Sequence, residues 1–570
     1  MKKNLQYILG IHQSGPIASA ALFLEGNLLV ACPEERVTRI KQDASFPNKA
    51  IQYCLDFAQI KIEDIQNIAI GWNPGINVSL RYRGGFSNGV RYPGDWLTSV
   101  PNNLLPKYQN NVNKTTEIFE FDKGKNLNIN YYDHHDCHSR LAQASSGFND
   151  CAILVVDGYG EQKTTSWVKY EKGKFSTIKE KIFPQSLGCL YAAVTNFLGY
   201  KPFSDEWRVM GMASYGNGKN FSQIEKLITL KESGDYEIDL SYFDFYNYDR
   251  PNFFSKKMTS LLGKEREVNE EIEQRHYDIA AALQSLFEKV MDHMLGELYI
   301  LTNTENICLA GGSAMNCVYN GTVTNRTKFN KCHISFAPDD SGNSIGAALM
   351  AIFESGLEPN KESITPYVGR EFSDLEIEDL LKKFKLTYKK KDNISKFTAS
   401  LLAQEKIVGW FQGRSEFGQR ALGMRSILAS PREAKMKDKI NSAVKFREPY
   451  RPFAPVIPLD NLMEYFDIKE SIHVPYMEKT LKFRVDKIKD VPAVVHQDMT
   501  GRVQTVTKDS NPLLLSVLNN FNELTGVPVI LNTSFNINGE PVVDTIEHAL
   551  RTYISSGLDA LVIGSYVIEK

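Results

Sequence analysis

The stretch from Asp133 to Glu161 constrains the fold more than any other part of this sequence. It reads DHHDCHSRLAQASSGFNDCAILVVDGYGE. Its first half has a composition compatible with a helix. The apolar run 152–156 that follows predicts a buried strand between Asp150 and Asp157-Gly158. Open α/β sheets place ligand chemistry at the carboxyl ends of their strands, and Asp157 stands at such an end.

The histidines at the start of this stretch have the spacing of metal ligands. His134 and His138 are four residues apart, so a helix would project both imidazoles from one face, one turn apart. That spacing can hold one metal ion, whereas His135 would point elsewhere. Asp157 would add a third ligand. The alternative is a surface helix with solvated histidines and an aspartate in an ordinary turn, and these residues alone leave both interpretations open.

Two later segments repeat the pattern of a strand followed by glycines and a helix. In NICLAGGSAMN, Gly311 and Gly312 would allow a phosphate to approach the backbone and the free N–H groups of the next helix. In SFAPDDSGNSIGAA, Asp340 could supply a fourth metal ligand. Its neighbour Asp339 could equally cap the following helix, which is the commoner role for such an aspartate.

Composition excludes several classes of protein. The chain has 570 residues, a net charge of −2 and 42% hydrophobic residues, which is typical of a soluble globular protein of more than one domain. Near-neutral charge provides no attraction to nucleic acid or to a membrane surface. The sequence shows no long apolar run and no signal peptide. Its eight cysteines form no C-x-x-C pair. A reducing, cytoplasmic location is therefore expected.

Residues 357–374 are polar and turn-rich, and the segment after them is dense in lysine. This change of character predicts a domain boundary near 360–370, and we place the two domains at 1–362 and 363–570. The second part has its own cationic centre, with ten Lys/Arg against four Asp/Glu between Arg414 and Arg451. Its arginines alternate with glycines and aromatic residues, which favours a pocket for phosphate oxygens over a solvated helix. Asn532 and Ser534, at a predicted strand tip, could also bond phosphate or nucleotide.

Several longer motifs carry a resemblance to a known family. They include HHDCH, VVDGYGE, GGSAMN, GRSEFGQRALGMRSILASPR, RVQTV and GVPVILNTSFNINGEP. On these motifs the chain resembles the O-carbamoyltransferases of the NodU/CmcH family, nearly end to end. The resemblance implies an α/β fold: an actin-like ATPase domain (ASKHA, ribonuclease H-like) of the threonylcarbamoyl-transferase type at 1–362, and a YrdC-like domain at 363–570.

The resemblance also implies an activity and its site residues. The YrdC-like domain would form carbamoyl-adenylate from carbamoyl phosphate and ATP. The first domain would then transfer the carbamoyl group to a hydroxyl of a small natural product or sugar. Whether the protein forms a homodimer is left open. The implied metal ligands, for Fe(2+) in relatives, are His134, His138, Asp157 and Asp340. The implied ligands of ATP and carbamoyl phosphate are Arg420, Lys445, Arg502 and Ser534, with Arg451 and Asn532 near. The implied adenylate contacts are Gly158, Glu161, Gly311, Gly312 and Asn316.

One departure from the family pattern affects the expected chemistry. Relatives carry a His-Asp pair just before the strand segment ASAAL, where this chain has Pro16 and Ile17. We hypothesise that His12, four residues before Pro16, replaces the missing histidine as general base. The expected catalytic set is therefore His12, Asp157, Arg420 and Lys445. The loop at 81–96, RYRGGFSNGVRYPGDW, could shape the acceptor pocket.

Two other functions are weighed against this one. A threonylcarbamoyl-type tRNA-modifying enzyme is disfavoured by the near-neutral charge and by the fusion of both domains in one chain. A non-catalytic metal- and nucleotide-binding protein is made credible by the altered loop at Pro16-Ile17. Dependence of AMP formation on carbamoyl phosphate separates these possibilities.

Overall fold

The computed structural model describes residues 6–74, 76, 114–121, 125–247, 252–446, 451 and 453–570. The loop at 81–96 therefore lies outside the described residues. The chain has a mixed α/β fold and divides into two compact units. One unit comprises Met1–Glu34 with Gln42–Thr365, and the other comprises Glu35–Lys41 with Pro366–Lys570. The predicted division into 1–362 and 363–570 did not place residues 35–41 with the second unit, as the structure does.

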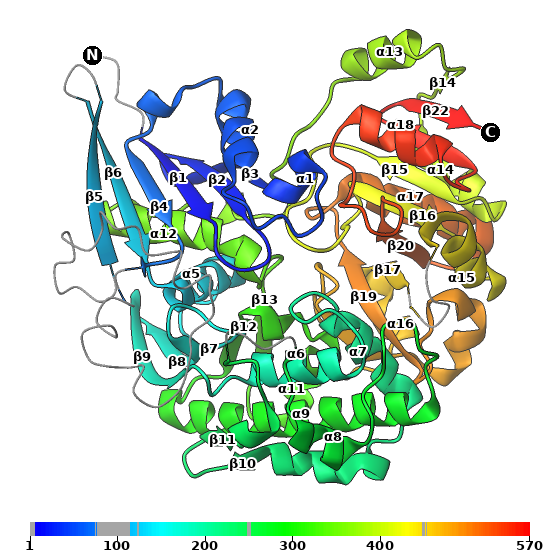
Figure 1. The fold of residues 1–570 in the computed structure, drawn as a ribbon. Coiled ribbons are helices and arrows are strands. Elements are labelled where there is room, and N and C mark those ends of the chain that lie inside the picture. The colour runs from blue at the N-terminus through cyan, green and yellow to red at the C-terminus, as the bar shows by residue number, and fades with distance from the viewer. Residues whose placement is uncertain are drawn as a thin grey trace. The chain divides into compact units, whose positions relative to one another are not determined.

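Two sheets form the framework of the first unit (Figure 1). In the six-stranded sheet, β1 pairs antiparallel with β2 and parallel with β4. In the five-stranded sheet, β12 lies parallel between β7 and β13. The six-stranded sheet has the order β3 (Asn27–Pro33), β2 (Ser19–Leu24), β1 (Tyr7–His12), β4 (Asn67–Ile70), β6 (Lys125–Tyr132) and β5 (Lys114–Phe121). The five-stranded sheet has the order β13 (Lys331–Ile334), β12 (Asn306–Ala310), β7 (Cys151–Val156), β8 (Lys163–Glu171) and β9 (Lys174–Ile182).

The predicted buried strand and the predicted helix before it are both present. All six residues of β7 are buried, as a continuous apolar run requires. Helix α5 (His134–Ser146) begins after Asp133, whose side chain accepts a hydrogen bond from the Asp136 backbone N–H. It ends at Gly147, which adopts the left-handed conformation that commonly terminates helices. The sequence therefore places His134 in the first turn of a well-capped helix.

Helices α5 and α12 (Asn343–Glu354) pack against each other between the two sheets (Figure 1). Helix α12 lies on β1 and β4, whereas α5 lies on β7 and β12. The two helices approach closely because position 346 is glycine: a Cβ there would stand 2.2 Å from the Cys137 carbonyl oxygen. This close packing brings the histidine face of α5 near the turn that precedes α12. On the other side, α9 (Gln274–Thr302) also contacts β7.

The second unit is built on one nine-stranded sheet of mixed direction. Helices α14 (Ile394–Ala403) and α17 (Pro512–Thr525) pack together, and α18 (Ile546–Ile554) contacts β15 and β21. Large apolar side chains such as Trp410 and Phe521 are fully buried in its core. The strands, in spatial order, are β14 (Lys389–Lys390), β22 (Tyr566–Glu569), β21 (Ala560–Ile563), β15 (Val408–Phe411), β16 (Arg425–Ala429), β20 (Ile530–Ser534), β17 (Ala454–Pro458), β19 (Thr500–Val506) and β18 (Lys479–Lys482).

The structure confirms the α/β class in its coarse form, and the actin-like and YrdC-like assignments stay predictions. Among the described residues, no helix combines the length and the apolar character needed to cross a membrane.

Candidate functional site

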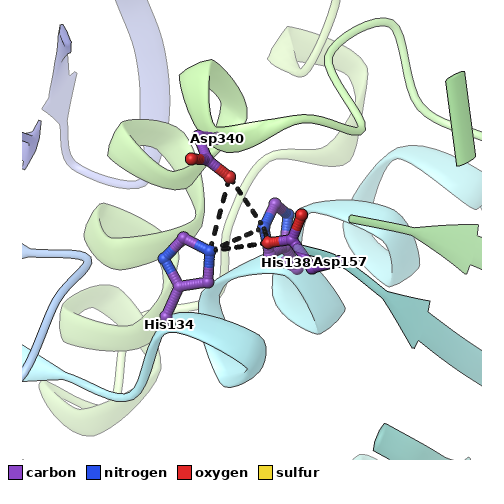
Figure 2. A group of neighbouring side chains, drawn as sticks. All are labelled: His134, His138, Asp157 and Asp340. Carbon is purple, nitrogen blue, oxygen red and sulfur yellow. Dashed lines mark hydrogen bonds and ion pairs between the residues drawn. The ribbon is translucent and has the colours of Figure 1, made fainter. Parts of the chain in front are cut away.

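Four side chains from three separate segments converge between α5 and α12 (Figure 2). His134 and His138 project from α5, Asp157 follows β7, and Asp340 lies in the turn before α12. One ligand atom of each residue lies within 4.8 Å of the others. Both imidazoles are almost fully buried, and Asp157 is 6% exposed. These are the four residues that the resemblance implied as metal ligands, and the structure brings them together.

The distances within this cluster fit the coordination sphere of a divalent metal ion. The Nε2 atom of His134 lies 3.1 Å from that of His138, 3.0 Å from Asp157 Oδ2 and 3.4 Å from Asp340 Oδ1. Ligands bonded at about 2.1 Å stand roughly 3.0–3.4 Å apart in octahedral or tetrahedral geometry. Two imidazole nitrogens and two carboxylate oxygens also form a donor set suited to iron, zinc or manganese.

Electrostatics within the cluster show how strongly these groups interact. Burial opposes protonation of His134, but the hydrogen bonds and charges of Asp157 and Asp340 raise its pKa well above the usual value. Burial likewise disfavours the ionised form of Asp157, yet its bonds to both histidines hold its pKa well below the usual range. The carboxylates therefore stay ionised at neutral pH, and a bound cation would take the place of the imidazole protons.

Two of the remaining polar atoms of the cluster, His134 Nδ1 and Asp157 Oδ1, are held by the protein. The Nδ1 atom of His134 lies 3.3 Å from the Gly71 carbonyl oxygen, a contact that favours the tautomer with Nε2 free for a metal. Asp157 Oδ1 accepts hydrogen bonds from the backbone N–H groups of Gly158 at 2.8 Å and Gly312 at 3.0 Å. Asp157 thus connects the cluster directly to the double-glycine turn after β12.

The residues implied as adenylate contacts have different surroundings. Gly158 and Gly312 meet at Asp157, whereas the N–H group of Gly311 donates to the Pro338 carbonyl oxygen. The buried carboxylate of Glu161 accepts hydrogen bonds from the backbone N–H groups of Asn73 and His134, so it supports the start of α5.

The amide of Asn316 is bonded to Gln284 and to the Tyr319 backbone N–H. In the described structure, Glu161 and Asn316 therefore contact other protein groups.

Sequence reasoning missed Asn343. Its side-chain nitrogen lies 3.1 Å from His134 Nδ1 and 3.4 Å from His134 Nε2. An asparagine at the start of a helix is usually a capping residue, so no signal in the sequence indicated a contact with a histidine 209 positions away.

His12 lies at the border of the cluster, at the end of β1. Its side chain is fully buried, its Nε2 atom is 3.8 Å from Asp340 Oδ2, and its ring centroid is 5.5 Å from that of His134. Neither ring nitrogen has a hydrogen-bond partner among the described residues. Burial lowers the pKa of His12 to about 4, although Asp340 opposes this effect, so the imidazole is neutral at physiological pH.

The predicted anion site lies in the second unit. Lys445 is 3% exposed, and its Nζ atom donates to four oxygens: the backbone oxygen of Ser534 at 2.5 Å, Ser534 Oγ at 3.2 Å, the backbone oxygen of Asn536 at 3.0 Å and Asn536 Oδ1 at 2.8 Å. The structure therefore brings Lys445 and Ser534 together, and it adds Asn536, which the sequence did not indicate.

The arginines of this site come from different segments of the second unit. Arg420 lies in the loop between β15 and β16, Arg502 lies on β19, and Arg451 precedes β17; all three are half-buried. Asn532 on β20 donates to the Ala421 carbonyl oxygen at 3.0 Å, so it fixes the residue next to Arg420.

Comparison with known proteins identifies the family. Residues 7–349 match the family described as Carbamoyltransferase N-terminus, and residues 399–570 match Carbamoyltransferase C-terminus. An uncharacterized protein of Synechocystis sp. is 33% identical over 99% of this chain and 97% of its own length. Nodulation protein NolNO of Sinorhizobium fredii is 34% identical over 97% of this chain and 78% of its own.

Among solved structures, component A of (R)-2-hydroxyglutaryl-CoA dehydratase from Acidaminococcus fermentans aligns with 62% of this chain and 99% of that one. The identity is 14% and the TM-score is 0.32, which is too low to support an inference. The family matches, by contrast, cover most of this chain and include all the residues of the two sites described above. The chain therefore belongs to the carbamoyltransferase family and is a carbamoyltransferase.

Proposed function

We propose that this carbamoyltransferase works in two steps, one in each unit. In the second unit, water would hydrolyse carbamoyl phosphate to carbamate and inorganic phosphate. A carbamate oxygen would then attack the α-phosphate of ATP and expel pyrophosphate, giving carbamoyl-adenylate. In the first unit, the acceptor hydroxyl would attack the carbamoyl carbon, and AMP would leave. The acceptor would be a hydroxyl of a small natural product or sugar.

This proposal rests on the contacts of Asp157, whose two carboxylate oxygens bind different groups. One of its oxygens faces His134 and His138, while the other accepts the N–H groups of Gly158 and Gly312. The candidate metal ligands are thereby joined to a glycine turn of the kind that lets a phosphate approach the backbone. A bound divalent ion, Fe(2+) in this proposal, would polarise the carbamoyl oxygen during transfer.

His12 supports the transfer step in this proposal. It is neutral, buried and without a hydrogen-bond partner among the described residues, and it lies beside Asp340. A neutral imidazole with a free nitrogen can accept the proton of the acceptor hydroxyl. His12 would thus replace the histidine that relatives carry at the position of Pro16. His12→Ala should abolish transfer with metal binding and folding unchanged, and full transfer by this variant would exclude the role.

The second unit supplies cations for the activation step. Arg420, Arg451 and Arg502 would bind the phosphoryl oxygens of ATP and carbamoyl phosphate, because forked guanidinium donors match such oxygens. Lys445 would add a point charge beside the Ser534 hydroxyl. Ser534 and Asn532 would supply further hydrogen bonds. Developing negative charge on phosphoryl groups is the feature that such a site stabilises.

The test uses the full chain loaded anaerobically with Fe(2+) and supplied with ATP and carbamoyl phosphate. AMP and pyrophosphate should form only when both substrates are present, and mass spectrometry should then detect a carbamoyl group on a hydroxylated acceptor. AMP formation that needs threonine would favour the tRNA-modifying alternative. An absence of AMP under all of these conditions would contradict the proposed activation step.

A further inference from the structure

Residues Glu35–Lys41 belong to the second unit, although the chain on both sides belongs to the first. This segment includes most of helix α1 (Glu34–Thr38) and carries two arginines. Arg39 attaches the segment firmly, since its Nη1 and Nη2 atoms donate to the carbonyl oxygens of Val542 at 2.6 Å and Pro541 at 2.7 Å. Arg39 therefore has a structural role that its contacts explain.

Arg36 lacks such an explanation. It is 3% exposed, and its Nη2 atom makes one long hydrogen bond of 3.4 Å to the Glu416 carbonyl oxygen. Its Nε and Nη1 atoms are buried and have no hydrogen-bond partner among the described residues. A buried guanidinium with unused N–H donors is costly unless an anion pairs with it. The unused donors of Arg36 therefore indicate a missing anionic partner.

A second arginine lies close enough to Arg36 for the two charges to interact. Burial, followed by the charge of Arg36, lowers the pKa of Arg39 to about 10. The nearby Glu416 carboxylate uses Oε1 to accept backbone N–H groups of its own loop, at 2.6 Å from Leu422 and 3.3 Å from Arg425. That loop also carries Arg420. Arg36 thus contacts the loop that presents an arginine of the predicted anion site.

We propose that Arg36 binds a phosphoryl oxygen of a substrate held by the second unit, in addition to the arginines named above. The choice of ATP or carbamoyl phosphate as that substrate rests on the proposed function. A planar guanidinium with free Nε and Nη1 donors can form two parallel hydrogen bonds to one phosphoryl group. The excursion of residues 35–41 would thereby contribute a binding group to the second unit.

Calorimetry on the full chain tests this proposal with ATP, carbamoyl phosphate and inorganic phosphate as separate probes. Arg36→Met should weaken at least one of them by about tenfold or more, and Arg36→Lys should recover part of the loss. The probe that is weakened identifies the source of the phosphoryl group. The thermal midpoint of the ligand-free Arg36→Met protein should equal or exceed that of the native chain, because an unpaired buried charge has been removed.

Arg39→Met is the matched control. It should lower the ligand-free midpoint, because two carbonyl oxygens lose their donors. Affinities within twofold of the native values in Arg36→Met, or a midpoint lowered as in Arg39→Met, would overturn the proposal, as would a native chain that binds none of the probes. A native chain that binds phosphate but forms no AMP would contradict the proposed function and leave the role of Arg36 standing.

Discussion

The cluster of candidate metal ligands in the first unit and the predicted anion site around Lys445 in the second unit differ in how their buried charged groups are paired. In the cluster, each of two imidazole nitrogens lies 3.0–3.6 Å from the two carboxylate oxygens. In the second site, the charged group is a lysine whose ammonium already donates to four protein oxygens. Acceptor atoms gathered in this way attract a cation, whereas a satisfied ammonium has little need of an added anion.

This difference indicates how each site would respond to its ligand. The cluster can take up a metal ion with little rearrangement, because the atoms that would not bind the ion are already fixed. At Lys445, a phosphoryl group must either join or replace the bonds to Ser534 and Asn536. Substitutions in the two sites should therefore separate metal binding from substrate activation.

The largest effect is expected from Asp157→Asn. The amide removes the ligand charge, and carbamoyl transfer should fall about 1,000-fold or more as metal affinity is lost. AMP formation in the second unit should stay within about threefold of the native rate, since that step does not use this charge. Metal content and AMP formation are measured on the same preparation.

Asp150→Asn is the control for this variant. Asp150 lies just before β7, and its carboxylate accepts the Lys172 backbone N–H. The change should leave metal content and transfer as in the native chain. If Asp157→Asn retains its metal, Asp157 is not a metal ligand and the cluster is not the metal site.

The next largest effect is expected from Lys445→Met. Four oxygens lose a charged donor, so the free energy of unfolding should fall by about 2–3 kcal/mol. AMP formation should fall by about 100-fold, with metal affinity unchanged. Lys439→Met, in the helix just before, removes an exposed ion pair to Asp559 and should change neither quantity measurably. A loss of metal in Lys445→Met would contradict the separation of the two sites.

The two sites also differ in how far they could be predicted. The spacing of His134 and His138 and the position of Asp157 after a buried strand predicted three ligands, because helix and strand periodicity determine where such side chains point. The sequence pattern offered Asp340 only as a possible fourth ligand, and the resemblance then implied it, since its position depends on how α12 packs on α5. The same limit applies to Asn343 and Asn536, whose contacts depend on tertiary packing that no local pattern encodes.

Gly15→Ala tests how sensitive the cluster is to the loop after His12. A Cβ at this position would stand 2.0 Å from Asp340 Oδ2, and the φ of 77° is unfavourable for alanine. Metal affinity should fall about tenfold as Asp340 is displaced. Gly147→Ala is the matched control, since its φ is 70° but no atom lies within 4 Å of the added Cβ. It should cost about 1 kcal/mol of stability without weakening metal binding.

The smallest effect is expected at Glu206, a half-buried acid of the first unit outside the cluster. Burial raises its pKa to about 7, and Asp205 adds to the rise, whereas hydrogen bonds from backbone N–H groups, including that of Phe203, act in the opposite direction. The folded chain therefore holds a proton that the unfolded chain loses at lower pH. The protein should lose stability as the pH rises from about 4.5 to about 7.

Glu206→Gln removes this titration while keeping an oxygen that can accept the Phe203 N–H. At pH 8 the variant should exceed the native chain in unfolding free energy by about 2 kcal/mol, less than the full shift would give because the side chain is partly exposed. At pH 4 the two proteins should be equal within error. Urea unfolding at both pH values measures the difference. An advantage of the same size at both pH values would show that packing, and not ionisation, distinguishes this acid from the paired carboxylates of the cluster.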